Sequence, residues 1–176
     1  MSINLIVIAI TTPIVNPRPI NKLRPLTIFY VNVQGLIHLR DLKSKVPRLN
    51  MKKVHELHGP IFTNKPDIII LKETWLKKSI INCEILPDET YKILRADRSG
   101  KTHPSDPSKP KKYRKDGGGI LIAHRLDIDI ERTEVSLKKV QGEILTVNFK
   151  LPSGKKFSVS TFHRVGTLGL ENFELV

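Results

Sequence analysis

The hydrophobic pattern of the chain predicts several buried strands. Residues 26–33 are almost entirely apolar and rich in β-branched and aromatic side chains, as expected of a strand inside a sheet. Residues 67–72 include four consecutive apolar residues, which is typical of a strand covered on both faces. Further strands are predicted at residues 91–97, 120–125, 142–149 and 155–164, the last two joined by a Pro-Ser-Gly turn.

One main helix interrupts the strands. Residues 36–64 are predicted to be mostly helical, with the main helix near residues 48–59 and its end at Gly59-Pro60. Apolar residues recur there at the spacing of one helix face, at Leu49, Val54, Leu57 and Ile61. Because one helix is combined with many strands, the fold class is predicted to be α/β or α+β with a strand-rich sheet as its body.

Two segments lack the pattern of a packed element. Residues 1–25 hold four prolines and one short apolar run, so they are expected to be an arm or linker outside the domain, or to add a strand. That run is shorter than the roughly 20 residues needed to span a bilayer, and it lacks the features of a signal peptide. Residues 98–116 are rich in proline and basic residues and are predicted to be a loop inserted into a domain of residues 26–176.

The charge of the chain indicates a polyanionic partner. Thirty Lys and Arg against 17 Asp and Glu give a formal net charge of +13, which favours nucleic acid over an acidic membrane surface. The single cysteine, Cys83, excludes an internal disulfide and is consistent with an intracellular, nuclear or cytoplasmic protein that is not secreted. The inserted loop could be a solvated segment or could lie against the DNA backbone, in which case the contacting residues would be Arg98, Lys109, Lys111, Lys112, Arg114 and Lys115.

Asn32 and Glu73 are the candidate metal-binding residues. Each is an oxygen-bearing side chain at the C-terminal end of an apolar strand, and strand alternation places Glu73 on the same face as Leu71. If the strands are neighbours, an amide oxygen and a carboxylate meet at one sheet edge, where they suit Mg²⁺. A cation there could activate water against a phosphodiester. In the structural alternative, Asn32 caps a turn and Glu73 pairs with Lys72 or Arg98.

Four stretches in order resemble a known family. TIFYVNVQGL, PDIIILKETWL, YKILRADRS and GGGILI, within residues 26–165, resemble the N-terminal half of the endonuclease/exonuclease/phosphatase family. They look most like the apurinic/apyrimidinic-type endonuclease domain of LINE-type, non-long-terminal-repeat retrotransposons. The resemblance implies an incomplete β-sandwich flanked by helices, and a DNA endonuclease in which Asn32 and Glu73 hold Mg²⁺ or Mn²⁺. It also places His163 at the position of an active-site tyrosine, with Arg164 approaching the phosphate.

The chain departs from that family at several points. Gln34 replaces the second Asn of the family's Asn-x-Asn-Gly, and Lys72 stands where Gln is common. The Gly-Asp-x-Asn and Ser-Asp-His motifs are absent, although they supply the base that activates water and the groups that stabilise the phosphate. We therefore expect a truncated domain that is weak or inactive alone, with a missing C-terminal half or a reverse-transcriptase region as its candidate partner.

Two further functions stay open at this point. The chain could be a non-catalytic transposon remnant that binds nucleic acid through charge, or the fold could act on another phosphoester such as an inositol phosphate or a sphingolipid. The sequence HELH at residues 55–58 is one residue short of a zinc motif and is expected to be a helix face. The glycines at 117–119 lack the Lys-Ser/Thr of a phosphate-binding loop and are expected to form a turn.

Overall fold

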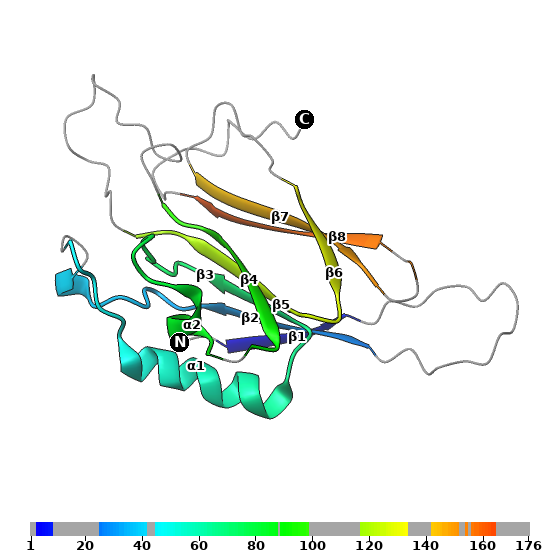
Figure 1. Cartoon of the computed structure of the whole chain (residues 1–176), viewed down its shortest axis with the longest axis horizontal. Coiled ribbons are helices and arrows are strands. Elements are labelled where there is room, and N and C mark those ends of the chain that lie inside the picture. Colours follow the sequence, from blue (N-terminus) through cyan, green and yellow to red (C-terminus); the bar gives the residue numbers. More distant parts are fainter. Residues whose placement is uncertain are drawn as a thin grey trace, which may run out of the picture.

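The protein consists of two β-sheets with helices on the outer face of one of them (Figure 1). The computed structural model describes residues 3–8, 25–41, 45–87, 89–98, 117–133, 142–151, 154 and 156–164. A five-stranded sheet has the order β1-β2-β3-β5-β4, and a three-stranded sheet the order β6-β7-β8. In chain order the elements are β1 (Ile3–Ile8), β2 (Leu26–Asn32), the 3₁₀ helix η1 (Leu39–Asp41), α1 (Met51–Asn64), β3 (Ile68–Lys72), α2 (Asn82–Ile85), β4 (Tyr91–Ala96), β5 (Ile120–Arg125), β6 (Asp129–Thr133), β7 (Gly142–Lys150) and β8 (Lys156–Arg164).

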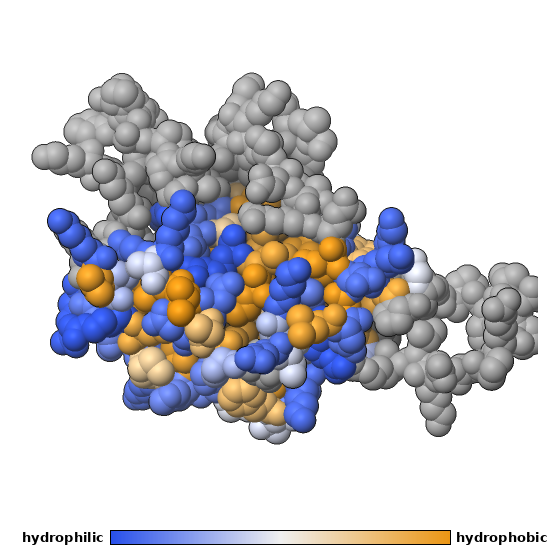
Figure 2. Space-filling model, viewed as in Figure 1, coloured by the Kyte–Doolittle hydropathy of each residue, from blue (hydrophilic) through white to orange (hydrophobic). Residues whose placement is uncertain are grey.

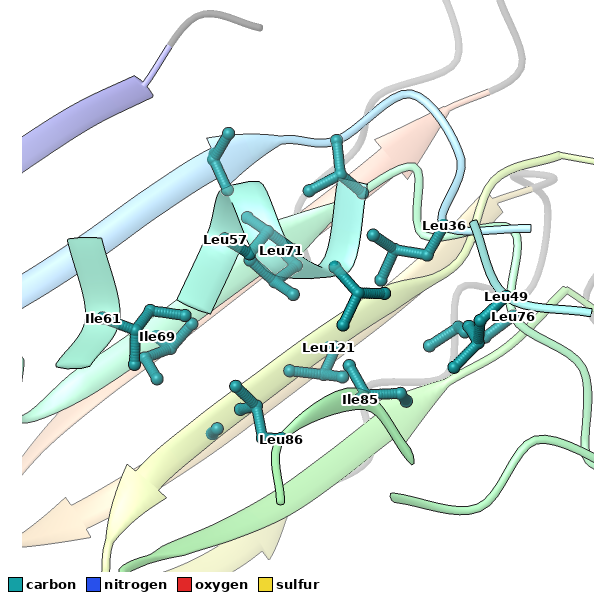
Figure 3. Packing of buried hydrophobic residues seen from close by; sticks show 14 of the residues in the cluster. Leu36, Leu49, Leu57, Ile61, Ile69, Leu71, Leu76, Ile85, Leu86 and Leu121 are labelled. Atoms are coloured by element: carbon teal, nitrogen blue, oxygen red, sulfur yellow. The ribbon is translucent and has the colours of Figure 1, made fainter. Parts of the chain in front are cut away.

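The five-stranded sheet is the middle layer because its inner strands are apolar on both faces. On β3, Ile69 and Leu71 belong to the core beneath the helices, whereas Ile68 and Ile70 belong to the core between the two sheets. Figure 3 shows Leu57 of α1 close to Leu71. These four apolar residues of β3 are buried, so the predicted strand covered on both faces is confirmed. The strand-rich α/β fold class is confirmed as well.

β2 and β3 are parallel neighbours, and their register sets the position of the candidate site. Asn32 at the end of β2 lies opposite Lys72 at the end of β3. The chain returns between them through α1, as a parallel pair requires a long crossover. Both strands therefore end at the same edge of the sheet, which is the arrangement that a site shared by Asn32 and Glu73 needs.

α1 continues past the end that the sequence predicts. It passes through Gly59 and Pro60, and closes where the N–H of Lys65 donates to the carbonyl of Ile61 (2.8 Å). The prediction of an end at Gly59-Pro60 is wrong because Ile61 is buried one turn beyond Leu57. This burial offsets the helix hydrogen bond that a proline cannot donate. Neither α-helix in the described part of the chain is long and apolar enough to cross a membrane.

α1 also begins later than predicted, and the segment before it is mostly not helical. Asn50 precedes the helix, and its Oδ1 accepts the N–H of Lys53 (3.4 Å). Such an N-terminal cap satisfies one of the N–H groups that the first turn leaves without a partner. Of the described residues in 36–50, only η1 is helical, so the expectation that residues 36–64 are mostly helical is wrong in this part.

Two strands were not foreseen as definite elements. β1 lies antiparallel to β2, from Ile3 opposite Val31 to Ile8 opposite Leu26, so the apolar run at the start of the chain adds a strand to the sheet. Residues 9–24 are outside the described part. β6 pairs antiparallel with β7, but its DIERT sequence contains one apolar residue and gives no strand pattern.

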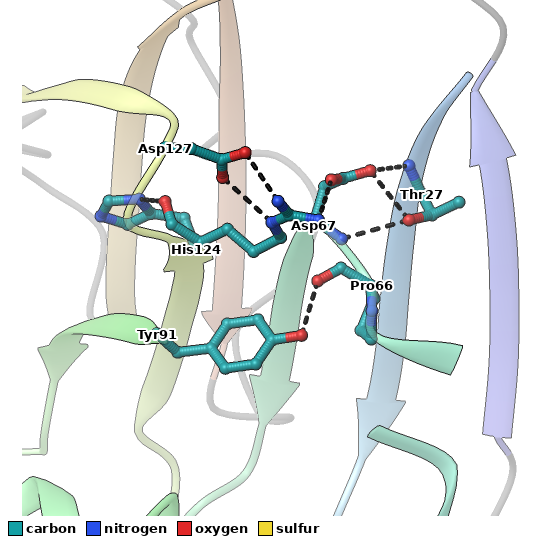
Figure 4. Close-up of polar contacts among 7 residues, drawn as sticks. Thr27, Pro66, Asp67, Tyr91, His124 and Asp127 are labelled. Atoms are coloured by element: carbon teal, nitrogen blue, oxygen red, sulfur yellow. Dashed lines mark hydrogen bonds and ion pairs between the residues drawn. The ribbon is translucent and has the colours of Figure 1, made fainter. Parts of the chain in front are cut away.

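Polar side chains hold the far edge of the five-stranded sheet, where β3 begins (Figure 4). Asp67 is buried, and its Oδ2 accepts the N–H and the hydroxyl of Thr27, both at 2.9 Å. The N–H of Arg125 donates to the carbonyl of Asp67 (3.0 Å), and the hydroxyl of Tyr91 donates to the carbonyl of Pro66 (2.8 Å). The Pro-Asp pair before β3 therefore ties β2, β4 and β5 together, away from the edge that carries Asn32.

Five large apolar side chains are exposed in the described part of the chain. In Figure 2, apolar residues form orange areas among the hydrophilic side chains of the visible face. Exposed apolar surface is ordinary for a folded protein and identifies no interface by itself. The exposed large apolar residues are Val46, Met51, Phe62, Ile81 and Leu126.

His124 is a buried imidazole that we expect to make stability depend on pH. Its Nδ1 donates to the carbonyl of Arg125 (2.8 Å), and its Nε2 has no hydrogen-bond partner in the described structure. Burial lowers the pKa of His124 below 6.5, and interactions with the backbone of Arg125 and Ile128 oppose that shift only in part. The positive charge of Lys92, which lies opposite on β4, adds to the lowering.

The unfolding free energy is expected to fall as the pH is lowered through the unfolded-state pKa of His124. The unfolded chain binds this proton at a higher pH than the folded chain does, so acid favours unfolding between the two pKa values. Urea unfolding between about pH 7 and pH 5 should show a steeper loss of stability in the wild type than in His124→Leu. His55→Leu, at an exposed position, should keep the wild-type slope. Equal slopes in wild type and His124→Leu would contradict the assignment.

Candidate active site

The edge where β2 and β3 end carries three turns that are hydrogen-bonded to one another. The turn after β2 bonds to the turn after β3, which in turn bonds to the glycines before β5. Close backbone pairing of this kind fixes the positions of the side chains that the turns carry. The N–H groups of Gly35, Leu36, Thr74 and Trp75 donate to the carbonyls of Glu73, Thr74, Gly119 and Gly118, at 2.7, 2.9, 3.2 and 2.8 Å respectively.

Glu73 lies in a turn and not in the strand. Its φ is 53°, and Trp75 and Gln34 also have positive φ, at 57° and 48°. Residues other than glycine rarely adopt this left-handed backbone conformation, and the ones that do concentrate at functional sites. Strand alternation therefore does not extend to Glu73, and the prediction that it shares the face of Leu71 by alternation is wrong, because β3 ends at Lys72.

The structure brings Asn32 and Glu73 into direct contact. The Nδ2 of Asn32 donates to Oε1 of Glu73 at 2.9 Å. The Oδ1 of Asn32 accepts the N–H of Gln34 at 3.1 Å, so Asn32 also closes the turn after β2. The two alternatives drawn from the sequence are thus both partly realised: the side chains converge, and the asparagine caps a turn. Lys53 of α1 holds the same turn, because its Nζ donates to the carbonyls of Val33 (3.1 Å) and Gln34 (2.7 Å).

The second sheet adds His163 to this pair. His163 on β8 lies opposite Glu143 on β7, and its Nδ1 is 3.0 Å from Oε2 of Glu143. The other ring nitrogen, Nε2, is 3.6 Å from Oε1 of Glu73. Asn32 and Glu73 were predicted from the sequence as a pair and His163 from the family resemblance, and the three side chains form one cluster in the structure.

Arg98 completes the cluster and has a different environment from the one expected. Its Nε donates to Oε1 of Glu143 at 2.8 Å, and the side chains of Arg98 and Glu143 are 8% and 0% exposed. The guanidinium of Arg98 is therefore buried in an ion pair with Glu143. Arg98 was predicted to contact DNA together with the basic loop, whereas its side chain is engaged inside the protein. Glu143 was not among the residues predicted from the sequence, where its only signal is an acidic residue at the start of an apolar strand.

The remaining site residues lie outside the described part of the structure. This holds for the predicted DNA-contacting residues of the inserted loop and for the side chain of Arg164, the last residue of β8. Those residues stay predictions. The loop residues concerned are Lys109, Lys111, Lys112, Arg114 and Lys115.

The donor set at this edge fits a hydrated divalent cation. Glu73 is 31% exposed and offers a carboxylate to the solvent, and Mg²⁺ commonly takes one or two carboxylates and keeps several waters. Asn32 presents Nδ2, not its oxygen, to Glu73, so the structure favours Glu73 as the direct ligand and Asn32 as the residue that orients it. Among the described residues, no group of three or more His, Cys, Asp or Glu side chains could hold a metal.

Comparison with known proteins gives a similarity of fold. The sequence matches no protein family and no curated protein significantly. The structure is similar to the human nocturnin catalytic domain with bound sulfate, at a TM-score of 0.52 and 14% sequence identity. The structure matches part of an endonuclease/exonuclease/phosphatase-type fold. The match covers 82% of this chain and 51% of the nocturnin chain, so the protein spans about half of the solved domain.

Two D. rerio TDP2 structures are also similar, although more distantly. One is TDP2 humanised by 14 mutations, with a TM-score of 0.49, and the other is TDP2 in complex with a single-strand DNA product, with a TM-score of 0.47. Each is 16% identical and is matched over 80% of this chain, covering 48% and 46% of the TDP2 chains respectively.

Proposed function

We propose that the chain is part of a metal-dependent phosphodiester hydrolase that nicks DNA, of the retrotransposon endonuclease type. The observation that carries the proposal is the contact of Asn32 with Glu73 at the shared end of two parallel strands. The similarity of fold to a nocturnin catalytic domain with bound sulfate supports it. The net charge of +13 supports a polyanionic substrate.

Each residue of the cluster has a role in this proposal. Glu73, oriented by Asn32, would hold Mg²⁺ or Mn²⁺, and the bound ion would screen the phosphate charge and activate water. His163, 3.6 Å from Glu73, would approach the phosphate beside the ion. We propose weak activity for this chain alone, because the sequence contains neither Gly-Asp-x-Asn nor Ser-Asp-His to supply a base and further phosphate contacts.

Glu73→Ala is expected to reduce Mg²⁺-dependent nicking of a supercoiled plasmid by about 100-fold or more, to the level seen with EDTA. The reason is that the substitution removes the carboxylate that would hold the ion. Glu56→Gln is the matched control, because Glu56 is an exposed carboxylate on α1, and it should nick at the wild-type rate. Nicking by Glu73→Ala at the wild-type rate would overturn the proposal.

The alternative function is that of a non-catalytic protein that binds nucleic acid. The net charge of +13 and the two absent motifs favour it. It predicts that affinity for a labelled duplex, measured by fluorescence anisotropy, falls steeply with salt because each phosphate contact releases a counterion. It also predicts no change on adding Mg²⁺ and no nicking. Mg²⁺-dependent nicking that is lost in Glu73→Ala would exclude this alternative.

A further inference from the structure

His163 is held at the site by a buried carboxylate. Glu143, with a fully buried side chain, is 3.0 Å from Nδ1 of His163 and is ion-paired with Arg98 at 2.8 Å. The pairing of β7 with β8 sets this geometry, since Glu143 and His163 are opposite residues in the register. The contact with Glu143 therefore orients the imidazole of His163 so that its Nε2 lies 3.6 Å from Oε1 of Glu73.

The short contact to Glu143 identifies the ring nitrogen that carries the proton. Two groups reach Nδ1 of His163: Oε2 of Glu143, which can only accept, at 3.0 Å, and Nη2 of Arg98, which can only donate, at 3.4 Å. The shorter contact favours the tautomer in which Nδ1 donates to Glu143. In the neutral imidazole, Nε2 then presents a lone pair toward the carboxylate of Glu73. Two acceptors facing each other repel, so a metal ion bound between them stabilises this arrangement.

The charges of the cluster favour the same conclusion. The carboxylate of Glu143 is matched by the guanidinium of Arg98, and the contact to Glu73 from Asn32 is neutral. Among these side chains, the carboxylate of Glu73 therefore has no cationic partner other than what binds between it and Nε2 of His163. A histidine that donates one ring nitrogen to a carboxylate and offers the other to a ligand is the usual arrangement of a metal-bound imidazole.

We propose that Glu73 and His163 together form a divalent metal site of mixed oxygen and nitrogen character, with Glu143 as the residue that positions the imidazole. Such a site takes ions that accept imidazole, such as Mn²⁺ and Zn²⁺, in preference to Mg²⁺, which prefers oxygen ligands. The inference rests on the proposed function only because Glu73 is the metal ligand in the proposed nuclease site and in this mixed site. It adds a nitrogen ligand and an ion preference that a pair of oxygen ligands does not have.

The test is metal binding by the full chain without DNA. Mn²⁺ binding is measured by the electron paramagnetic resonance signal of the free ion, and Mg²⁺ and Zn²⁺ by competition with Mn²⁺. His163→Ala is expected to weaken binding of Mn²⁺ and Zn²⁺ by about 10-fold or more, and that of Mg²⁺ by less than about 2-fold. His55→Ala, which removes an exposed imidazole from α1, should leave all three affinities unchanged.

A spectroscopic measurement shows whether His163 coordinates the metal ion or only supports the structure of the site. Electron spin echo modulation of bound Mn²⁺ should show a coordinated imidazole nitrogen in the wild type and in His55→Ala. The nitrogen signal should be lost in His163→Gln, which replaces the imidazole with an amide and serves if His163→Ala does not fold. Wild-type binding of Mn²⁺ without a nitrogen signal, or equal Mn²⁺ affinity in folded His163 variants, would overturn the inference.

The outcome is distinguishable from that of the nuclease proposal. Coordinated imidazole in a protein that nicks no DNA would support the metal site and refute the proposed function. Mg²⁺-dependent nicking that needs Glu73, with no nitrogen signal from His163, would support the proposed function and refute the mixed site.

Discussion

Replacing Gly35 with alanine is expected to destabilise the protein by about 2–5 kcal/mol, because the new side chain has neither a permitted backbone conformation nor room. Gly35 has φ of 88°, where a Cβ is strained. That Cβ would lie 2.1 Å from Cε3 of the Trp75 ring. The backbone of Trp75 is held in place, since its backbone N–H donates to the carbonyl of Gly118 at 2.8 Å. Urea unfolding of the two proteins measures the difference.

Gly59→Ala is the matched control for this substitution. Gly59 lies inside α1, and a Cβ there meets no atom within 4 Å. Alanine at this position should stabilise the protein by about 0.5–1 kcal/mol, since glycine is the poorer residue in a helix interior. If Gly35→Ala were as stable as the wild type or as Gly59→Ala, the packing of Trp75 over Gly35 would be contradicted.

The strands and the convergence of Asn32 with Glu73 could be predicted because they follow from local patterns. The apolar residues of β3 face two cores, so the strand reads as a continuous apolar run. Once two such strands are parallel neighbours, their ends share a sheet edge, and polar residues at those ends meet. That the two strands are parallel neighbours does not follow from residues 26–33 and 67–73 alone, so the convergence was predicted conditionally and was favoured by the family resemblance.

The parts that could not be predicted depend on contacts between distant segments. The position of Glu73 is set by a turn bonded to the glycines before β5, so strand alternation gave it the wrong face. Glu143 is buried only because β7 packs on the first sheet and pairs with β8. The continuation of α1 through Pro60 depends on the burial of Ile61 against β-strands. In each case tertiary packing overrides a local preference.

The ion pair of Arg98 with Glu143 is expected to be the most costly polar contact to break. Its two side chains are 8% and 0% exposed, so removing one charge leaves the other in a poorly solvated position. Glu143→Leu should therefore lower the unfolding free energy by about 3–5 kcal/mol, measured by urea denaturation. The loss should be larger than that of an ordinary surface charge because water cannot replace the missing carboxylate beside the guanidinium.

Two further variants test whether the cost of Glu143→Leu comes from the uncompensated charge. The double variant Arg98→Met with Glu143→Leu removes both charges and should recover most of the lost stability, since an apolar pair of similar volume often replaces a buried ion pair without loss. Arg48→Met breaks the pair with Asp41, in which Arg48 is 71% exposed, and should cost about 1 kcal/mol or less. A double variant no more stable than Glu143→Leu would show that shape, and not charge, determines the cost at this position.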